Sequence, residues 1–159
     1  RVMSGGMFLN NQLTDFSLLP EVAGQLVANS VAPGKRPRSS MTPVIIFNQD
    51  GSFFAALGSP GGPKIISYVA QTVIALLDYD LNMQEAINLP RHVTTGKVLE
   101  LEAGTPLTKL KPKLEAMGHE VVLKRQHSGV HGIRLNKNHA TEMIDGGADP
   151  RREGRVLTK

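Results

Sequence analysis

The chain has 159 residues, enough for one domain with a hydrophobic core, and no apolar run approaches the roughly 18 residues that a membrane span needs. The net charge of +4 is mild and aromatic residues are few, so nucleic-acid binding has little support, and we expect the basic residues late in the chain to be solvated: Arg151, Arg152, Arg155 and Lys159. Cysteine is absent, which excludes disulfides and thiolate chemistry.

The first quarter of the chain is expected to hold little regular structure. A strand is predicted at residues 7–9, soon after an opening at Arg1 that has neither an initiator methionine nor a leader. From its length we expect residues 1–159 to be a single domain. Because natural domains rarely open so close to an element, we also expect the chain to be a fragment of a longer or processed protein. Residues 10–43 are polar and rich in glycine and proline, and a loop of this length is more often functional than idle.

A hairpin and two helices are predicted next. The apolar runs at 43–47 and 52–57 flank an Asn-Gln-Asp-Gly turn, which indicates two antiparallel strands. Apolar residues then recur at helical spacing from 64 to about 78. Asn82 followed by Glu85 is a capping-box pattern, which predicts a short helix that ends before the next proline.

The rest of the chain is predicted to hold strands and one further helix. The helix covers 107–117, and Pro112 inside it means that it either starts late or is kinked. Four segments are typical of strands, the last two joined by a turn at 136–139: 98–101, 121–124, 130–135 and 140–144. Tight hairpins, with helices in separate blocks, indicate an α+β fold in layers with a mostly antiparallel sheet.

The loop before the helix at 64–78 is rich in residues that shape the backbone, namely Gly58, Pro60, Gly61, Gly62 and Pro63. Glycines at a strand-to-helix corner bring backbone N–H groups close to the helix N-terminus, which has unpaired donors and a partial positive charge. The corner is therefore suited to a negative atom, either a bound anion or an oxyanion formed during a reaction. A tight connection without a ligand is an equally common use of such a loop.

Nucleotide binding by this loop is excluded by its residue types. Residues 58–64 have the span of a phosphate loop, but Pro63 has no N–H to offer a phosphate. Ile65 also stands where a phosphate loop has the hydroxyl residue that binds magnesium.

The histidines give little support for a metal site or a general base. His127 and His131 have helical spacing, yet their neighbours favour a strand, in which side chains four residues apart lie about 13 Å from each other. His92 could act as a base, although an isolated histidine is more often a packed or surface residue. The sequence has no Gly-x-Ser-x-Gly motif, so a serine triad has no support.

Two polar clusters in and beside the long loop are candidate binding residues. Gln12 and Asp15 lie between apolar anchors, and an amide beside a carboxylate suits an ammonium group. Ser39 and Ser40 lie between prolines that restrict the backbone, and two hydroxyls in such a segment could hold a carboxylate. Taken singly, each cluster is more commonly a cap or a turn.

Five segments, taken in order, carry a resemblance to a known family: 9–17, 34–43, 58–62, 88–91 and 147–151. Over nearly its whole length the chain resembles the small subunit of gamma-glutamyltranspeptidase, and the Ser-Ser-Met and Gly-Ser-Pro-Gly-Gly blocks are highly specific. The resemblance implies the four-layer αββα sandwich of the N-terminal nucleophile hydrolases.

The resemblance also implies an acyl transfer that needs neither a metal nor a cofactor. In this family a threonine, freed at the N-terminus of the small subunit by self-cleavage, attacks a gamma-glutamyl amide such as glutathione, and the acyl group passes to water or an amino acid. By position, Gly61 and Gly62 would supply the N–H groups of the oxyanion hole. The other roles fall to the two polar clusters, with Gln12 and Asp15 on the alpha-ammonium and Ser39 and Ser40 on the alpha-carboxylate.

Partners and setting follow from the same resemblance. The expected partners are the large subunit of the same precursor, a gamma-glutamyl substrate and an amino-acid acceptor, without nucleic acid or membrane, and most bacterial members are exported. The family's threonine has no counterpart at Arg1, so we expect its segment and the large subunit to lie outside this chain, which would be inactive alone. Thr14 stands where many members have an acidic residue, and Pro63 where a small polar residue is common.

Two other functions stay open at this point. A related acylase of the same superfamily would act on glutaryl or other side-chain amides, which lack the alpha-ammonium group that Asp15 would hold. A non-catalytic domain would use the glycine loop to bind a small anion.

Overall fold

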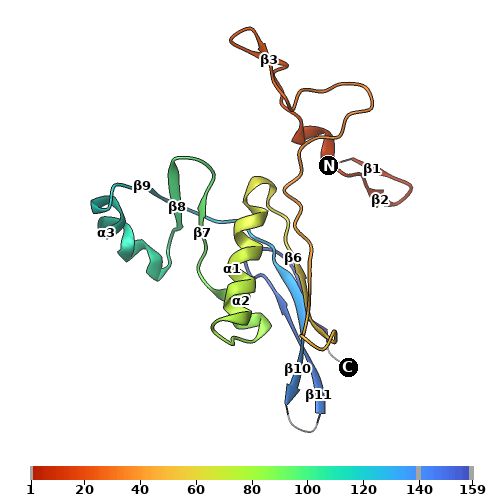
Figure 1. Ribbon diagram of the computed structural model, residues 1–159, viewed down its shortest axis with the longest axis vertical. Coiled ribbons are helices and arrows are strands. Elements are labelled where there is room, and N and C mark those ends of the chain that lie inside the picture. Colours follow the sequence, from red (N-terminus) through yellow and green to blue (C-terminus); the bar gives the residue numbers. More distant parts are fainter. Residues whose placement is uncertain (1, 139–140, 158–159) are drawn as a thin grey trace. The chain divides into compact units, whose positions relative to one another are not determined.

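The computed structural model describes residues 2–138 and 141–157, and it divides the chain into two compact units, Arg1–Ser39 and Ser40–Lys159 (Figure 1). His139, in the predicted turn at 136–139, and Ala140, at the start of the last predicted strand, lie outside the described residues. No helix in the described part of the chain has the length and apolar character needed to cross a membrane.

The first unit consists of two small hairpins and one 3-10 helix: β1 (Met3–Ser4), β2 (Met7–Phe8), η1 (Gln12–Asp15), β3 (Glu21–Val22) and β4 (Gln25–Leu26). The strand β2 confirms the strand predicted at this position. Among the described residues of this unit only Phe16 is buried, so the segment is held mainly by hydrogen bonds. One of these joins the N–H of Ser17 to the carbonyl of Asn29 over 2.9 Å.

The second unit is built on a four-stranded antiparallel sheet in the order β11-β10-β6-β5. Its strands are β5 (Val44–Phe47), β6 (Phe53–Gly58), β10 (His131–Asn138) and β11 (Thr141–Ala148). Both hairpins were predicted, but the turn predicted at 136–139 was wrong at 136–138, because these residues pair with β11 and belong to β10. The first follows from its turn, where the N–H of Asn48 donates to the carbonyl of Ser52 over 2.8 Å.

Two helices, α1 (Ile65–Leu77) and α2 (Met83–Asn88), pack on one face of this sheet (Figure 1). The capping box of α2 is formed as predicted, with Asn82 and Glu85 each accepting from the other's main-chain N–H. At Gly147 of β11 a Cβ would lie 2.6 Å from Cδ1 of Ile87, so glycine allows α2 to approach the sheet closely.

A second, three-stranded sheet lies in the same unit, with β8 (Val98–Glu102) between β7 (His92–Thr94) and β9 (Glu120–Lys124). The pair β8–β9 is parallel, and its connection holds η3 (Pro106–Leu110) and α3 (Lys111–Ala116). Pro112 lies in the first turn of α3, so the predicted helix starts late rather than kinking. The short strand β7 was not predicted. Helices and mostly antiparallel strands in separate blocks confirm the α+β class.

The other face of the four-stranded sheet is apolar and, in the described chain, is covered only in part, by Val156 beside Gly146. The register aligns Ile45, Ala56 and Ile133 across three strands on this face. Ile45 is 63% exposed, and Phe47 and Ile144 are exposed to a similar degree. An apolar sheet face of this kind is usually covered by another element or subunit.

Candidate active site

The two glycines that follow Pro60, Gly61 and Gly62, form a corner between β6 and α1, and we refer to this pair as the glycine corner. Gly61 has φ of +146° and Gly62 has φ of +58°, conformations that favour glycine. Gly62 begins the short 3-10 helix η2 (Gly62–Lys64) that leads into α1. Among the described residues no hydrogen bond uses the N–H of either glycine. Two adjacent free donors at the start of a helix can stabilise a negatively charged oxygen.

Ser59 fixes the approach to the glycine corner. Its hydroxyl donates to the carbonyl of Pro60 over 2.7 Å and accepts from the N–H of Gly129 over 3.2 Å. A Cβ at Gly129 would lie 2.8 Å from Cγ of Pro60, so glycine at position 129 lets the segment before β10 pack directly against the loop that holds the glycine corner.

A network of polar side chains, which we call the Glu100 network, joins α1 and η2 to the second sheet. Tyr68, near the start of α1, donates its hydroxyl proton to Oε1 of Gln126 over 2.8 Å, and Nε2 of Gln126 donates to Glu100 over 3.1 Å. Glu100 also accepts from Lys64 and, over 3.0 Å, from Lys124. Burial raises the pKa of the Tyr68 hydroxyl, so it stays protonated and donates at neutral pH.

Glu100 is held as a carboxylate by its three donors. Its burial alone would raise its pKa, but the hydrogen bonds from Lys64, Gln126 and Lys124 outweigh that effect and bring the pKa to about 2. Because this lies below the ordinary value of 4.5, ionised Glu100 stabilises the fold fully above that value and progressively less as the pH falls toward 2.

We therefore expect Glu100→Gln to flatten the acid dependence of stability. The wild-type free energy of unfolding should fall between about pH 5 and pH 2, and the variant should lose less over the same window. Urea titrations at a series of pH values measure this slope. Glu115→Gln is the matched control, because Glu115 is exposed and pairs only with Lys111 over 3.6 Å in the described chain. Equal slopes for Glu100→Gln and wild type would contradict the assignment.

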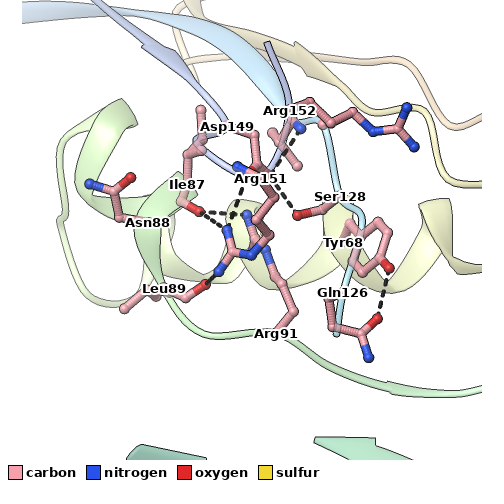
Figure 2. A network of polar contacts seen from close by, with 12 residues as sticks. Tyr68, Ile87, Asn88, Leu89, Arg91, Gln126, Ser128, Asp149, Arg151 and Arg152 are labelled. Atoms are coloured by element: carbon pink, nitrogen blue, oxygen red, sulfur yellow. Dashed lines mark hydrogen bonds and ion pairs between the residues drawn. The ribbon is translucent and has the colours of Figure 1, made fainter. Parts of the chain in front are cut away.

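A second network, which we call the C-terminal network, is centred on Arg151 (Figure 2). Its guanidinium group donates to Glu102 over 2.6 and 2.8 Å and to Asp149 over 3.1 Å. It also donates to the carbonyls of Ile87 and Leu89 at the end of α2, over 3.2 and 2.9 Å. The prediction that Arg151 is solvated was therefore wrong, because two carboxylates and a helix C-terminus hold it in place.

Asp149 anchors the same network from within the core. It is 1% exposed, and its Oδ2 accepts from the hydroxyl of Ser128 over 2.5 Å and from the N–H of Val130 over 3.3 Å. Burial would raise its pKa, but the hydrogen bonds from Ser128 and Arg151 prevail and hold the pKa below its usual range. Asp149 is therefore ionised at neutral pH beside Arg151.

Arg91 completes this network and is itself 0% exposed (Figure 2). Its Nη2 donates to the carbonyl of Ile87 over 2.9 Å, and its main-chain N–H donates to Glu102 over 2.7 Å. Burial and the neighbouring charge of Arg151 lower the pKa of Arg91 to about 10. Only Arg151 pairs its guanidinium group with the two carboxylates, whereas Nε and Nη1 of Arg91 are buried without a hydrogen-bond partner in the described part of the chain. The two motifs at 88–91 and 147–151 meet here, which sequence analysis did not foresee.

Gln12 and Asp15, the predicted ammonium site, are the first and last residues of η1 in the first unit. The N–H of Gln12 donates to Oδ1 of Asn10 over 3.0 Å, and the carbonyl of Asp15 accepts from Nδ2 of Asn29 over 2.7 Å. One short turn thus carries both side chains, and the Asp15 residue is exposed.

Ser39 and Ser40, the predicted carboxylate site, lie in an extended segment at the boundary of the two units. Ser39 is exposed and Ser40 is half-buried, and the carbonyl of Ser40 accepts from the hydroxyl of Thr42 over 2.9 Å. The six predicted site residues therefore divide between the units: Gln12, Asp15 and Ser39 in the first, and Ser40, Gly61 and Gly62 in the second.

The three histidines that sequence analysis considered lie at the start of a strand or just before one. His92 begins β7, where its main-chain N–H and carbonyl both bond the side-chain amide of Gln71, and burial with the charge of Arg91 lowers its pKa. His131 begins β10 and its Nδ1 lies 3.0 Å from the carbonyl of Gly129, whereas His127 precedes the strand. Within residues 2–138 and 141–157 no group of three or more histidine or acidic side chains is arranged to bind a metal ion.

Comparison with known proteins places the chain in a family. The model of the gamma-glutamyltranspeptidase family matches residues 1–158. The chain is 40% identical over 153 residues to a glutathione hydrolase proenzyme of Escherichia coli, and the aligned region covers 92% of this chain and 26% of that protein. It is 38% identical over 132 residues to an acylase ACY 1 proenzyme of a Pseudomonas species, covering 82% of this chain and 22% of the other.

Solved structures agree with the sequence comparison. The gamma-glutamyltranspeptidase of Pseudomonas nitroreducens, solved with L-DON, superposes with a TM-score of 0.80 at 30% identity, covering 99% of this chain and 84% of that chain. The chain spans about a quarter of the length of the proenzymes that it matches. It belongs to the gamma-glutamyltranspeptidase family.

Proposed function

We propose that the chain is part of an enzyme that transfers the gamma-glutamyl group of amides such as glutathione to water or to an amino acid. One observation carries this proposal: the glycine corner presents two unused main-chain donors, Gly61 and Gly62, in a chain of this family. Such a pair suits the oxyanion that forms when a nucleophile adds to an amide carbonyl.

The proposed reaction has two halves. A threonine hydroxyl, from a part of the protein outside this chain, attacks the gamma-carbonyl carbon, and its proton passes to the threonine's own amine. The carbonyl oxygen becomes an oxyanion at Gly61 and Gly62 until the carbon–nitrogen bond breaks and the amine leaves with the proton. Water or an amino acid then attacks the acyl-threonine and regenerates the hydroxyl.

The polar clusters would hold the head of the glutamyl group. We assign the alpha-ammonium to Gln12 and Asp15, because an exposed carboxylate beside an amide on one turn offers charge-assisted hydrogen bonds. We assign the alpha-carboxylate to Ser39 and Ser40, whose hydroxyl groups can donate to it.

The proposed partner is the large subunit of the same precursor. The relatives are proenzymes, and the second unit has a partly open apolar sheet face that includes Ile45, Phe47 and Ile133. A subunit that packs on this face would remove the apolar side chains from water, which supports an assembled enzyme.

Release of the dye from a chromogenic gamma-glutamyl anilide tests the proposal. The protein assembled with its threonine segment and large subunit should turn the anilide over, and the 159-residue chain alone should not. Turnover by the chain alone would contradict the assignment of the nucleophile. Glutamate binding to the chain, measured by calorimetry, together with no turnover by the assembled protein, would favour a non-catalytic binding domain.

The likeness to an acylase proenzyme favours a second candidate, an acylase, for which we propose glutaryl-type amides as substrates. Asp15 discriminates between the two candidates. In the assembled enzyme Asp15→Ala should lower kcat/KM for the gamma-glutamyl anilide by about 10²-fold, since a charged contact is worth about 2–3 kcal/mol, and should spare the glutaryl anilide. Asp50→Ala is a control at an exposed turn. Equal losses on the two anilides would count against the role of Asp15.

A further inference from the structure

We propose that Tyr68 and Gln126 are positioning residues that fix the glycine corner through the Glu100 network. The inference rests on the proposed function, because it gives these residues a part in stabilising the oxyanion at Gly61 and Gly62. Sequence analysis singled out neither residue, and their link to the corner follows from packing.

The ring of Tyr68 occupies the space beside Gly61 in which a side chain would otherwise stand. A Cβ built on Gly61 would lie 2.8 Å from Cε2 and 3.2 Å from Cδ2 of Tyr68. The ring is 1% exposed, so the surrounding core holds it in place. It therefore forms a wall that opposes movement of Gly61 toward α1.

A second connection reaches the corner through Lys64. The N–H of Lys64 donates to the carbonyl of Gly61 over 3.3 Å, so the two peptides are tied together. The side chain of Lys64 pairs with Glu100 and lies 3.5 Å from Oε1 of Gln126. Tyr68 donates to that same oxygen over 2.8 Å.

These contacts make Gln126 the common partner of two side chains that border the glycine corner. Gln126 is 1% exposed, and its amide is oriented because its NH₂ group donates to Glu100 over 3.1 Å while its oxygen accepts from Tyr68. The oxygen thus points toward Tyr68 and Lys64. An oxyanion hole gains from donors that are fixed before the reaction begins, and loosening them slows the chemical step more than it weakens substrate binding.

Tyr68→Phe tests the inference because it removes only the hydroxyl and keeps the ring. In the assembled enzyme we expect kcat for a gamma-glutamyl anilide to fall about tenfold while KM changes less than about twofold. Gln126→Met, which keeps the length of the side chain, should give the same pattern. Tyr79→Phe is the matched control, since Tyr79 is 65% exposed, and it should leave both constants unchanged. A kcat within twofold of wild type in both network variants, or a loss confined to KM, would overturn the inference.

A measurement without substrate separates this inference from the proposed function. We expect the ¹⁵N order parameters of Gly61 and Gly62 to fall from about 0.85 to below about 0.7 in Tyr68→Phe, with those of Gly104 unchanged. If the wild-type enzyme fails to turn over the anilide, the proposed function is wrong, and the order parameters still decide whether the network fixes the corner. Unchanged order parameters would refute it.

Discussion

Replacing Arg151 by methionine is expected to lower the free energy of unfolding by about 3–5 kcal/mol, because it leaves Glu102 and Asp149 buried without their guanidinium partner. The loss should shrink as the pH falls through the range in which carboxylates become protonated. The pKa of Asp149 is held below its usual range in the intact network, so its ionised form contributes stability above the ordinary carboxylate pKa and loses it below.

Chemical denaturation followed by circular dichroism at pH 7 and at about pH 3, below the ordinary carboxylate pKa, measures both effects. Arg152→Met is the matched control, because the neighbouring Arg152 is exposed and its Nε donates to a single carbonyl, that of His127, over 2.9 Å. We expect the control to lose less than about 1 kcal/mol. A similar loss in both variants would show that removal of any arginine from this segment has the same cost.

Gly61→Ala is expected to reduce turnover of a gamma-glutamyl anilide by about 10²-fold in the assembled enzyme. Its Cβ would meet the ring of Tyr68 at 2.8 Å, and φ of +146° is a conformation that alanine rarely adopts. The corner must therefore shift, and the N–H groups would no longer point at the position of the oxyanion. The strain should also lower the free energy of unfolding by about 1–3 kcal/mol.

Gly104→Ala is the control that separates the loss of turnover from the loss of stability in Gly61→Ala. Gly104 has φ of +76° but open space around its Cβ position, so alanine there should cost about 1–2 kcal/mol of stability and leave turnover unchanged. Steady-state kinetics beside thermal melts of both variants provide the comparison. Retention of more than a tenth of wild-type turnover by Gly61→Ala would contradict the role of the corner.

Local patterns predicted those parts of the fold that short-range interactions determine. The hairpin β5–β6 follows from its turn, α1 from apolar periodicity, and α2 from the Asn82–Glu85 capping box. Strand β7 was missed because it has only three residues and depends on pairing with β8 and on the amide of Gln71. Nothing in its own sequence distinguishes it from a loop.

Only part of the candidate site could be predicted from the sequence. Glycine content was enough to identify the loop at 58–64 as a corner suited to a negative atom, and the family resemblance then singled out Gly61 and Gly62, to which the structure gives positive φ. The Glu100 network could not be predicted, because its members are up to 62 residues apart and ordinary surface residues by type. The same reason explains the error at Arg151, whose charge near other basic residues suggested solvation until Glu102 and Asp149 were found beside it.

The sequence separation of the contacts in the C-terminal network leads us to expect an order in which the second unit assembles. Arg151 bonds Ile87 and Glu102 across 64 and 49 residues, whereas the strands of the two hairpins pair with neighbours that are close in sequence. Contacts between distant residues close large loops, and chains rich in them fold slowly. During synthesis α2 therefore leaves the ribosome well before Arg151, whose guanidinium group binds the carbonyls at the end of that helix. We expect the hairpins to form first and the arginine-carboxylate contacts last, so that these contacts stabilise the unit only once the rest of it has folded.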